Sequence, residues 1–302
     1  MERIIEEINE LKKTRKAVIL AHLYQPDEIQ EIADFTGDSL ELSRQAAQTD
    51  AEVILFCGVH FMAETANILS PDKIVLLSDR RAGCRMADMI TAEALAAKKA
   101  QHPNAVVVAY VNTSAAVKAL SDICCTSANA VKVLQSIPAD REILFVPDQN
   151  LGAYAGQQAG RKVINWSGFC PVHHGLFAEE IEDMKALYPE ALVLAHPECP
   201  AEILAKADYV GSTTGIIKYA QESSAEAFII ATERGVLHRL HKLCPSKKFY
   251  LASDSMNCPN MKYTTLAKVK NALETLEPRV IVPQEIREKA VSSLEKMLKI
   301  CR

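Results

Sequence analysis

Short runs of Val, Ile and Leu alternate along the chain with longer segments in which apolar residues recur at helical spacing. This alternation is typical of an α/β protein, in which crossover helices cover both faces of a parallel sheet. Strong patterns predict strands at residues 17–22, 52–57, 73–78, 105–111, 141–147, 161–166, 191–196, 226–231 and 247–252. Weaker patterns predict further strands near residues 34–37, 121–125 and 207–211.

The order of these elements repeats three times. The segments AVILAHLY, AVVVAYVN and ALVLAHPE begin at residues 17, 105 and 191, and each opens a section that reads β-α-β-α-β-α-β. This repeat predicts three similar α/β/α domains with small parallel sheets, at residues 1–84, 85–170 and 171–274. Domains this small bury too little surface alone, so we expect a pseudo-threefold packing around one centre. The tail 275–302 is grouped with the first domain and expected to pack back on the body. The alternative to a true repeat is that the three α/β sections resemble one another by chance.

Composition excludes several classes of function. The 302 residues are 49% apolar, and 34 Lys and Arg against 38 Asp and Glu give a formal charge of −4. Because no basic cluster is interleaved with aromatics, we expect no nucleic-acid partner. Neither a signal peptide nor an apolar run of about 18–20 residues is present, which predicts a cytoplasmic protein outside the membrane.

Three of the nine cysteines keep the period of the repeat. Cys84, Cys170 and Cys258 each follow the last strand of a section. Because functional groups of parallel sheets gather at the carboxyl ends of strands, three docked domains would bring these thiols to one point. Cys57, Cys244 and Cys301 do not keep the period and are interpreted as packing or surface residues. Cys124, Cys125 and Cys199 lie near strand ends and are candidates for the wall of a site.

Three converging thiolates favour an iron–sulfur cluster over structural zinc. Structural zinc normally has four protein ligands, often in local C-x₂-C pairs, which these three cysteines do not form. A cubane cluster held by three cysteines has one iron with an open position, and such an iron acts as a Lewis acid suited to dehydration. The alternative interpretation is that the three cysteines are buried by coincidence and bind no metal.

Polar residues occupy the same strand-end positions. His22 and Tyr24 follow the first strand of section one, and the equivalent residues of the other sections are Tyr110, Asn112, His196 and Glu198. Glu198 is a candidate general base if its surroundings raise its pKa. His173 and His174 are candidate ligands, with a supporting role beside Cys170 favoured. Ser39, Ser127, Ser212 and Thr213 precede helices, where they either cap the helix or help bind an anion.

Taken together, these motifs resemble the quinolinate synthase family. The resemblance extends over the whole chain, through AHLYQ, GDS, GCRMADMI, AYVNTSA, SDICCTSANA, FVPDQNLG, WSGFCPVHH, AHPEC, GSTTGI and CPNMK. It implies three similar α/β domains in a triangular assembly around a [4Fe–4S] cluster. The cluster ligands of the family match Cys84, Cys170 and Cys258.

The resemblance also implies a reaction. Iminoaspartate would condense with dihydroxyacetone phosphate to give quinolinate in NAD biosynthesis, with an aspartate-oxidising enzyme as functional partner. Carboxylates or phosphate would be held by His22, Tyr24, Ser39, Tyr110, Asn112, Ser127, His196, Ser212 and Thr213. Tyr110 and Glu198 are the strongest candidates for proton transfer. Some family members carry two further cysteines just before the third ligand, but here ASDSMN stands there, which argues against a redox switch.

Two other classes of function stay open from the residues alone. One is a different hydro-lyase with an open-iron cluster, such as a hydroxy-acid dehydratase. The other is a non-catalytic protein, either an iron–sulfur sensor or a zinc-stabilised binding module.

Overall fold

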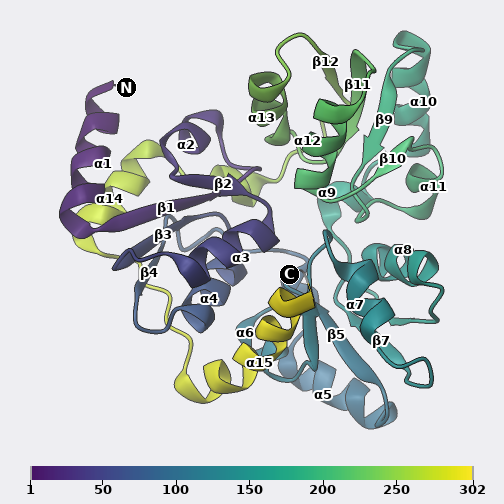
Figure 1. The fold of residues 1–302 in the computed structure, drawn as a ribbon, viewed down its shortest axis with the longest axis horizontal. Helices are drawn as coiled ribbons and strands as arrows, with labels where there is room; N and C mark the ends of the chain where they lie inside the picture. Colours follow the sequence, from purple (N-terminus) through teal and green to yellow (C-terminus); the bar gives the residue numbers. More distant parts are fainter. Residues whose placement is uncertain (1, 301–302) are drawn as a thin grey trace.

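The computed structural model describes residues 2–300 of the chain. Figure 1 shows three lobes arranged around a common centre, each built around its own small sheet. The described residues form three four-stranded sheets in which every strand pair is parallel. The predicted α/β class with three similar units is therefore confirmed, whereas Cys301 lies outside the described residues.

Each unit is a run of alternating strands and helices. The first contains α1 Glu2–Arg15, β1 Ala17–His22, α2 Asp27–Ile32, β2 Phe35–Gly37, α3 Ser39–Gln48, β3 Val53–Cys57, α4 His60–Leu69 and β4 Ile74–Leu77. The second contains η1 Ala87–Met89, α5 Ala92–Gln101, β5 Val106–Tyr110, α6 Ala115–Ala119, β6 Ile123–Cys125, α7 Ala130–Ser136, β7 Ile143–Val146, α8 Gln149–Ala159 and β8 Ile164–Asn165. The third contains α9 Pro171–His174, α10 Ala178–Leu187, β9 Leu192–Ala195, α11 Ala201–Leu204, β10 Tyr209–Val210, α12 Thr213–Glu222, β11 Ala227–Ala231, α13 Val236–Leu243 and β12 Lys248–Leu251. The chain then continues through η2 Pro259–Lys262, α14 Leu266–Thr275 and α15 Gln284–Ile300.

The three sheets share one topology. Their strand orders are β2-β1-β3-β4, β6-β5-β7-β8 and β10-β9-β11-β12, so the first strand of each unit is central and the second lies at the edge. The central strands are almost wholly buried runs of apolar residues, as expected for a sheet covered on both faces. All functional groups that follow the strands therefore lie at one edge of each sheet.

A matched hydrogen bond recurs in each unit. Asp34, Asp122 and Asp208 precede the second strand of their units. Each carboxylate accepts a 2.8 Å hydrogen bond from a backbone N–H of the central strand, at Ile19, Val107 and Val193 respectively. Three equivalent side chains making the same bond indicate that the repeat is structural and does not arise from apolar composition alone.

The last two helices pack on the first two units. Helix α14 lies against α1 and β3, and α15 lies against α6, β6 and α4 (Figure 1). The buried residues of α15, among them Leu294 and Met297, join a core cluster shared by units one and two. Helix α15 therefore contacts units one and two, and α14 contacts the first unit although it begins inside residues 171–274. The exact domain boundaries stay a prediction.

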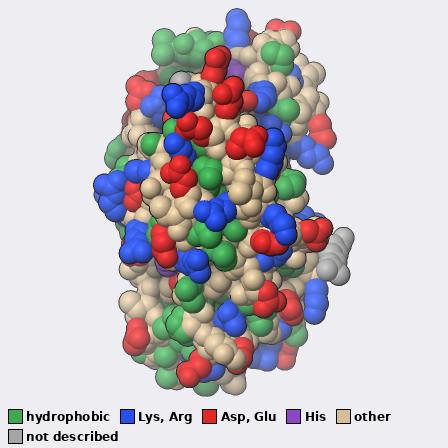
Figure 2. All heavy atoms as spheres, turned by 90° about the vertical axis from the view of Figure 1, so that its left-hand side faces the viewer, with side chains coloured by type: hydrophobic (Ala, Val, Ile, Leu, Met, Phe, Trp, Pro, Cys, Tyr) green, Lys and Arg blue, Asp and Glu red, His purple; other side chains and the backbone are tan. Residues whose placement is uncertain are grey.

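The surface carries charges of both signs. Figure 2 shows Lys and Arg side chains interspersed with Asp and Glu over the face that includes α1 and α14. Across residues 2–300, no helix combines the length and apolar character needed to cross a membrane.

Candidate active site

A cavity of about 270 Å³ lies where the three units meet. Residues that follow strands of all three sheets line it, which places the carboxyl ends of the sheets around one space. Of the residues predicted from sequence, those that line the cavity are His22, Tyr24, Ser39, Cys84, Tyr110, Asn112, Ser127, Cys170, His173, His196, Glu198, Thr213 and Cys258. Two of the predicted polar residues are not part of this lining, Ser212 and the candidate ligand His174.

Each of the three cysteines begins a short helical turn. Cys170 and Cys258 directly precede a proline that occupies the first turn of α9 and η2, and Cys84 lies just before η1. Backbone N–H groups two or three residues further on donate to the sulfurs: Met86 and Ala87 to Cys84, His173 to Cys170, and Asn260 and Met261 to Cys258. Such N–H···S hydrogen bonds stabilise thiolates and tune iron–sulfur clusters.

Without metal these groups are thiols. Burial raises the pKa of Cys84 to about 12 and also raises the pKa values of Cys170 and Cys258. The three cysteines also influence one another: a negative charge on Cys258 raises the pKa of Cys84, and a negative charge on Cys84 raises the pKa of Cys170. A bound metal cluster reverses this situation because its positive iron deprotonates coordinating thiols.

Two buried histidines present the same edge to the cavity. The backbone N–H of Tyr24 donates to Nδ1 of His22 at 3.1 Å, and the N–H of Glu198 donates to Nδ1 of His196 at 3.3 Å. Burial lowers the pKa of both histidines to about 3, so both are neutral at pH 7. Because Nδ1 accepts in each ring, Nε2 carries the proton. The Nε2–H group of His196 donates to Ser127 Oγ at 3.2 Å. These imidazoles can donate to anionic oxygens without adding charge.

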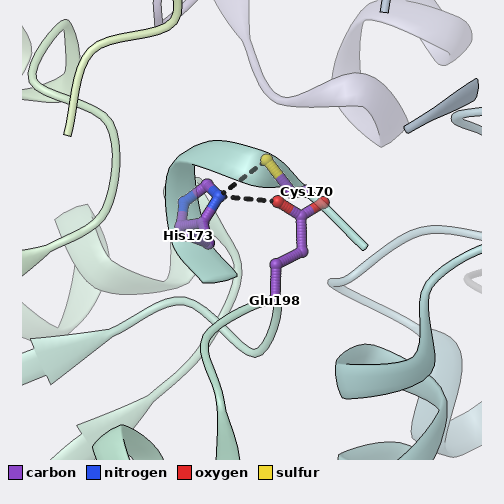
Figure 3. Close-up of side chains that lie close together, drawn as sticks. All are labelled: Cys170, His173 and Glu198. Atoms are coloured by element: carbon purple, nitrogen blue, oxygen red, sulfur yellow. Dashed lines mark hydrogen bonds and ion pairs between the residues drawn. The ribbon is translucent and has the colours of Figure 1, made fainter. Parts of the chain in front are cut away.

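Glu198 is the central charged group of the site. Its Oε2 lies 2.8 Å from Nδ1 of His173, which is also 3.3 Å from the sulfur of Cys170 (Figure 3). Donor atoms of Cys170, His173 and Glu198 all lie within 4.8 Å of one another, a spacing that suits metal ligation. Burial acts to raise the pKa of Glu198, but the neighbouring imidazoles of His196 and His173 and the hydrogen bonds from His173 and Tyr110 outweigh it, and the pKa lies below its ordinary value. The raised pKa expected for a general base is therefore not found, and the carboxylate is ionised at pH 7.

The second unit contributes Tyr110 and Asn112. Tyr110 is buried at the end of β5, and burial followed by the charge of Glu198 raises its pKa well above the ordinary value. Tyr110 therefore carries its proton and donates to Glu198. The side-chain oxygen of Asn112 is buried without a hydrogen-bond partner among the described residues, so an acceptor is available to a ligand.

The hydroxyl residues before helices divide into two groups. Ser212 caps α12 by accepting the N–H of Gly215 at 3.2 Å, the ordinary structural role of such a residue. Thr213 instead bonds Tyr24, and Ser127 bonds His196. Ser39 is the first residue of α3, whose cap is Asp38.

Sequence reasoning did not select Glu233, although it also lines the cavity. This fully buried carboxylate follows β11 and accepts the backbone N–H groups of Cys258 at 3.0 Å and Gly235 at 2.7 Å. Its cation is Lys262, 2.9 Å away, whose ammonium also donates to the carbonyl oxygen of Tyr24. Its position in the sequence could have identified it, since Glu233 follows a central strand as Glu198 does.

The remaining described cysteines lie in the cores. Cys57, Cys199 and Cys244 are buried in apolar clusters, and Cys124 and Cys125 belong to the core shared by units one and two. None of the five lines the cavity. The packing interpretation of Cys57 and Cys244 agrees with this placement, and the wall role considered for Cys124, Cys125 and Cys199 receives no support.

Comparison with known proteins gives one consistent family. The sequence model of a family described as "Quinolinate synthetase A protein" matches residues 6–299. A protein from Desulforudis audaxviator named quinolinate synthase is 58% identical over 297 residues, which cover 98% of each chain. Proteins of the same name from Geobacter metallireducens and Methanosarcina barkeri are 54% and 52% identical, over 299 and 297 residues. These matches cover 99% and 98% of this chain and 98% and 97% of the relatives, and so run through all three units.

Proposed function

This chain belongs to the quinolinate synthase family, and from that premise we propose that it condenses iminoaspartate with dihydroxyacetone phosphate to form quinolinate. The reaction releases phosphate and two waters, which balances the atoms of the two substrates. It supplies the pyridine ring in NAD biosynthesis. Iminoaspartate must come from an enzyme that oxidises aspartate.

We further propose that Cys84, Cys170 and Cys258 hold a [4Fe–4S] cluster in the cavity. The fit rests on one soft donor from each unit, on backbone N–H groups aimed at each sulfur, and on a cavity with space beside them. When bound, a cluster with three protein ligands supplies a Lewis-acidic iron with an open position. His173 then supports the site from beside Cys170.

The polar lining binds the substrates in this proposal. The neutral imidazoles of His22 and His196 donate Nε2–H groups to carboxylate oxygens, and Asn112 offers an amide. Ser39, Ser127 and Thr213 add hydroxyls near helix starts, where backbone N–H groups favour phosphate. Ser212 contributes by capping α12 and so fixes the position of Thr213.

Glu198 and Tyr110 are the proposed proton-transfer pair. Glu198 is buried, ionised and able to accept a proton from a substrate carbon or nitrogen, while protonated Tyr110 lies hydrogen-bonded beside it. Tyr24 belongs to the same wall and contacts Thr213. Enclosure in a cavity between the units keeps bulk water from these groups.

The observation that carries the proposal is the meeting of three periodic cysteines and the strand-end polar residues in one cavity of a chain from this family. The test is anaerobic reconstitution with iron and sulfide, followed by an assay with dihydroxyacetone phosphate and iminoaspartate formed from oxaloacetate and ammonium. We expect a brown protein that forms quinolinate. A protein that binds a complete cluster but forms no quinolinate would favour the hypothesis of an iron–sulfur sensor. A colourless protein that contains zinc and no sulfide would exclude the cluster.

A further inference from the structure

Five buried side chains form one continuous line of hydrogen bonds between units one and three. Thr213 Oγ1 lies 2.9 Å from the hydroxyl of Tyr24, which lies 2.8 Å from Thr232 Oγ1. Thr232 Oγ1 lies 2.9 Å from Nε2 of His173, whose Nδ1 lies 2.8 Å from Glu198. Thr232 is wholly inaccessible and is not part of the cavity lining.

The carboxylate at the end of this line fixes the direction of the bond beside it. An ionised Glu198 only accepts, so Nδ1 of His173 carries the proton between them. The single hydroxyl of Thr232 lies between Nε2 of His173 and the hydroxyl of Tyr24 and contacts both.

We propose that Thr232 is a positioning residue for the reaction, which orients Tyr24 and His173 together and, through His173, the carboxylate of Glu198. This inference rests on the proposed function. Its hydroxyl connects two sides of the cavity that carry proposed catalytic residues, Tyr24 from unit one and Glu198 from unit three. A side chain of the same shape without the hydroxyl takes one hydrogen-bond partner from Tyr24, which keeps Thr213, and takes the partner of Nε2 from His173.

The test compares three variants of the anaerobic holoenzyme. Thr232→Val removes the hydroxyl and keeps the shape, and Thr232→Ser restores the hydroxyl. Thr264→Val is the matched control, because buried Thr264 also bonds a side-chain hydroxyl, Ser78 Oγ at 2.7 Å, outside the line and the cavity lining. We expect Thr232→Val to lower kcat roughly 10- to 100-fold with little change in KM. Thr232→Ser should recover most of the rate, and cluster absorbance and thermal unfolding should match those of Thr264→Val.

A kcat for Thr232→Val within about twofold of that of Thr264→Val, or a Thr232→Ser variant as slow as Thr232→Val, would overturn the inference. A second measurement does not depend on activity. ¹⁵N-histidine NMR of the wild-type holoenzyme should show a proton on Nδ1 of His173, the nitrogen that faces Glu198, and a ring whose only proton is on Nε2 would overturn the inference. A wild-type enzyme that makes no quinolinate would refute the proposed function, while the tautomer of His173 would still decide this inference.

Discussion

The side-chain amide of Asn260 donates a 2.8 Å hydrogen bond to the carbonyl oxygen of Gly83. Asn260 lies two residues after Cys258, and Gly83 directly precedes Cys84, so this bond joins the loops that carry two of the three periodic cysteines. A second bond of this kind runs from the indole N–H of Trp166 to the carbonyl oxygen of Met89 at 3.0 Å, and joins the loop before Cys170 to η1 after Cys84. The three loops thus hold one another in place through protein contacts alone.

We therefore expect Asn260→Ala to weaken retention of the proposed cluster. Loss of one neutral hydrogen bond costs about 1 kcal/mol, which corresponds to roughly fivefold faster loss of iron if the loops must separate to release it. The measurement is the decay of cluster absorbance in the presence of an iron chelator under anaerobic conditions. Asn271→Ala on the exposed side of α14 is the control, and equal decay rates for the two variants would show that the loop contact does not matter.

Single replacement of Cys84, Cys170 or Cys258 by Ala is expected to abolish the intact cluster. Each supplies the only periodic thiol of its unit that lines the cavity among the described residues, so no neighbouring sulfur can substitute. Replacement of Cys57 or Cys244 by Ala should leave iron and sulfide content unchanged and cost only about 1 kcal/mol of stability through lost packing. Iron and sulfide analysis after anaerobic reconstitution tests this assignment. Comparable loss of iron in the Cys57 or Cys244 variant would mean that the ligand assignment is wrong.

The ion pair between Lys262 and Glu233 should contribute measurably to stability. Glu233 is fully buried, and Lys262→Met would leave its charge without a cation. We expect a loss of about 2–3 kcal/mol in unfolding free energy, below the full cost of breaking a buried pair because Lys262 stays partly solvated. A double-mutant cycle with Glu233→Gln isolates the pair. The exposed Lys206–Glu182 pair is the matched control and should couple by less than about 1 kcal/mol, so similar coupling energies for the two pairs would contradict this prediction.

The architecture could be predicted because its signals are local. Each strand is a short apolar run, and all twelve described strands fall within predicted segments. The edge strands β8 and β10 are shorter than predicted, at two residues each, since β8 pairs with β7 only at Ile164 and Asn165, and β10 pairs with β9 only at Tyr209 and Val210. Apolar residues continue beyond the last backbone pairing of each strand, so the sequence pattern overestimates the lengths of β8 and β10.

The candidate site could be predicted only in part. His22 ends the first strand of its unit and Glu198 follows the first strand of its unit, so their positions in the sequence identify them as candidate site residues. Thr232 and Glu233 follow β11, but their importance comes from partners in other loops, His173 and Lys262 among them. Such partnerships are properties of the packed units, and the spacing of residues along the chain does not record them.

The buried histidines predict how stability depends on pH. Burial lowers the pKa of His22 and His196 to about 3 in the folded protein, whereas the ordinary value of 6.5 applies once the chain unfolds. Between these values the unfolded chain binds more protons than the folded chain, so the free energy of unfolding falls as pH drops below about 6.5 and is unaffected by these groups above it. Glu198, whose pKa lies below its ordinary value when folded, acts in the same direction at lower pH. We expect His22→Gln to reduce the slope by up to about 1.4 kcal/mol per pH unit, since the variant has one fewer group to protonate. Urea unfolding of the cluster-free protein and its variant between about pH 5 and pH 7.5 measures this difference. Identical slopes for the two proteins would show that His22 is not held neutral by burial.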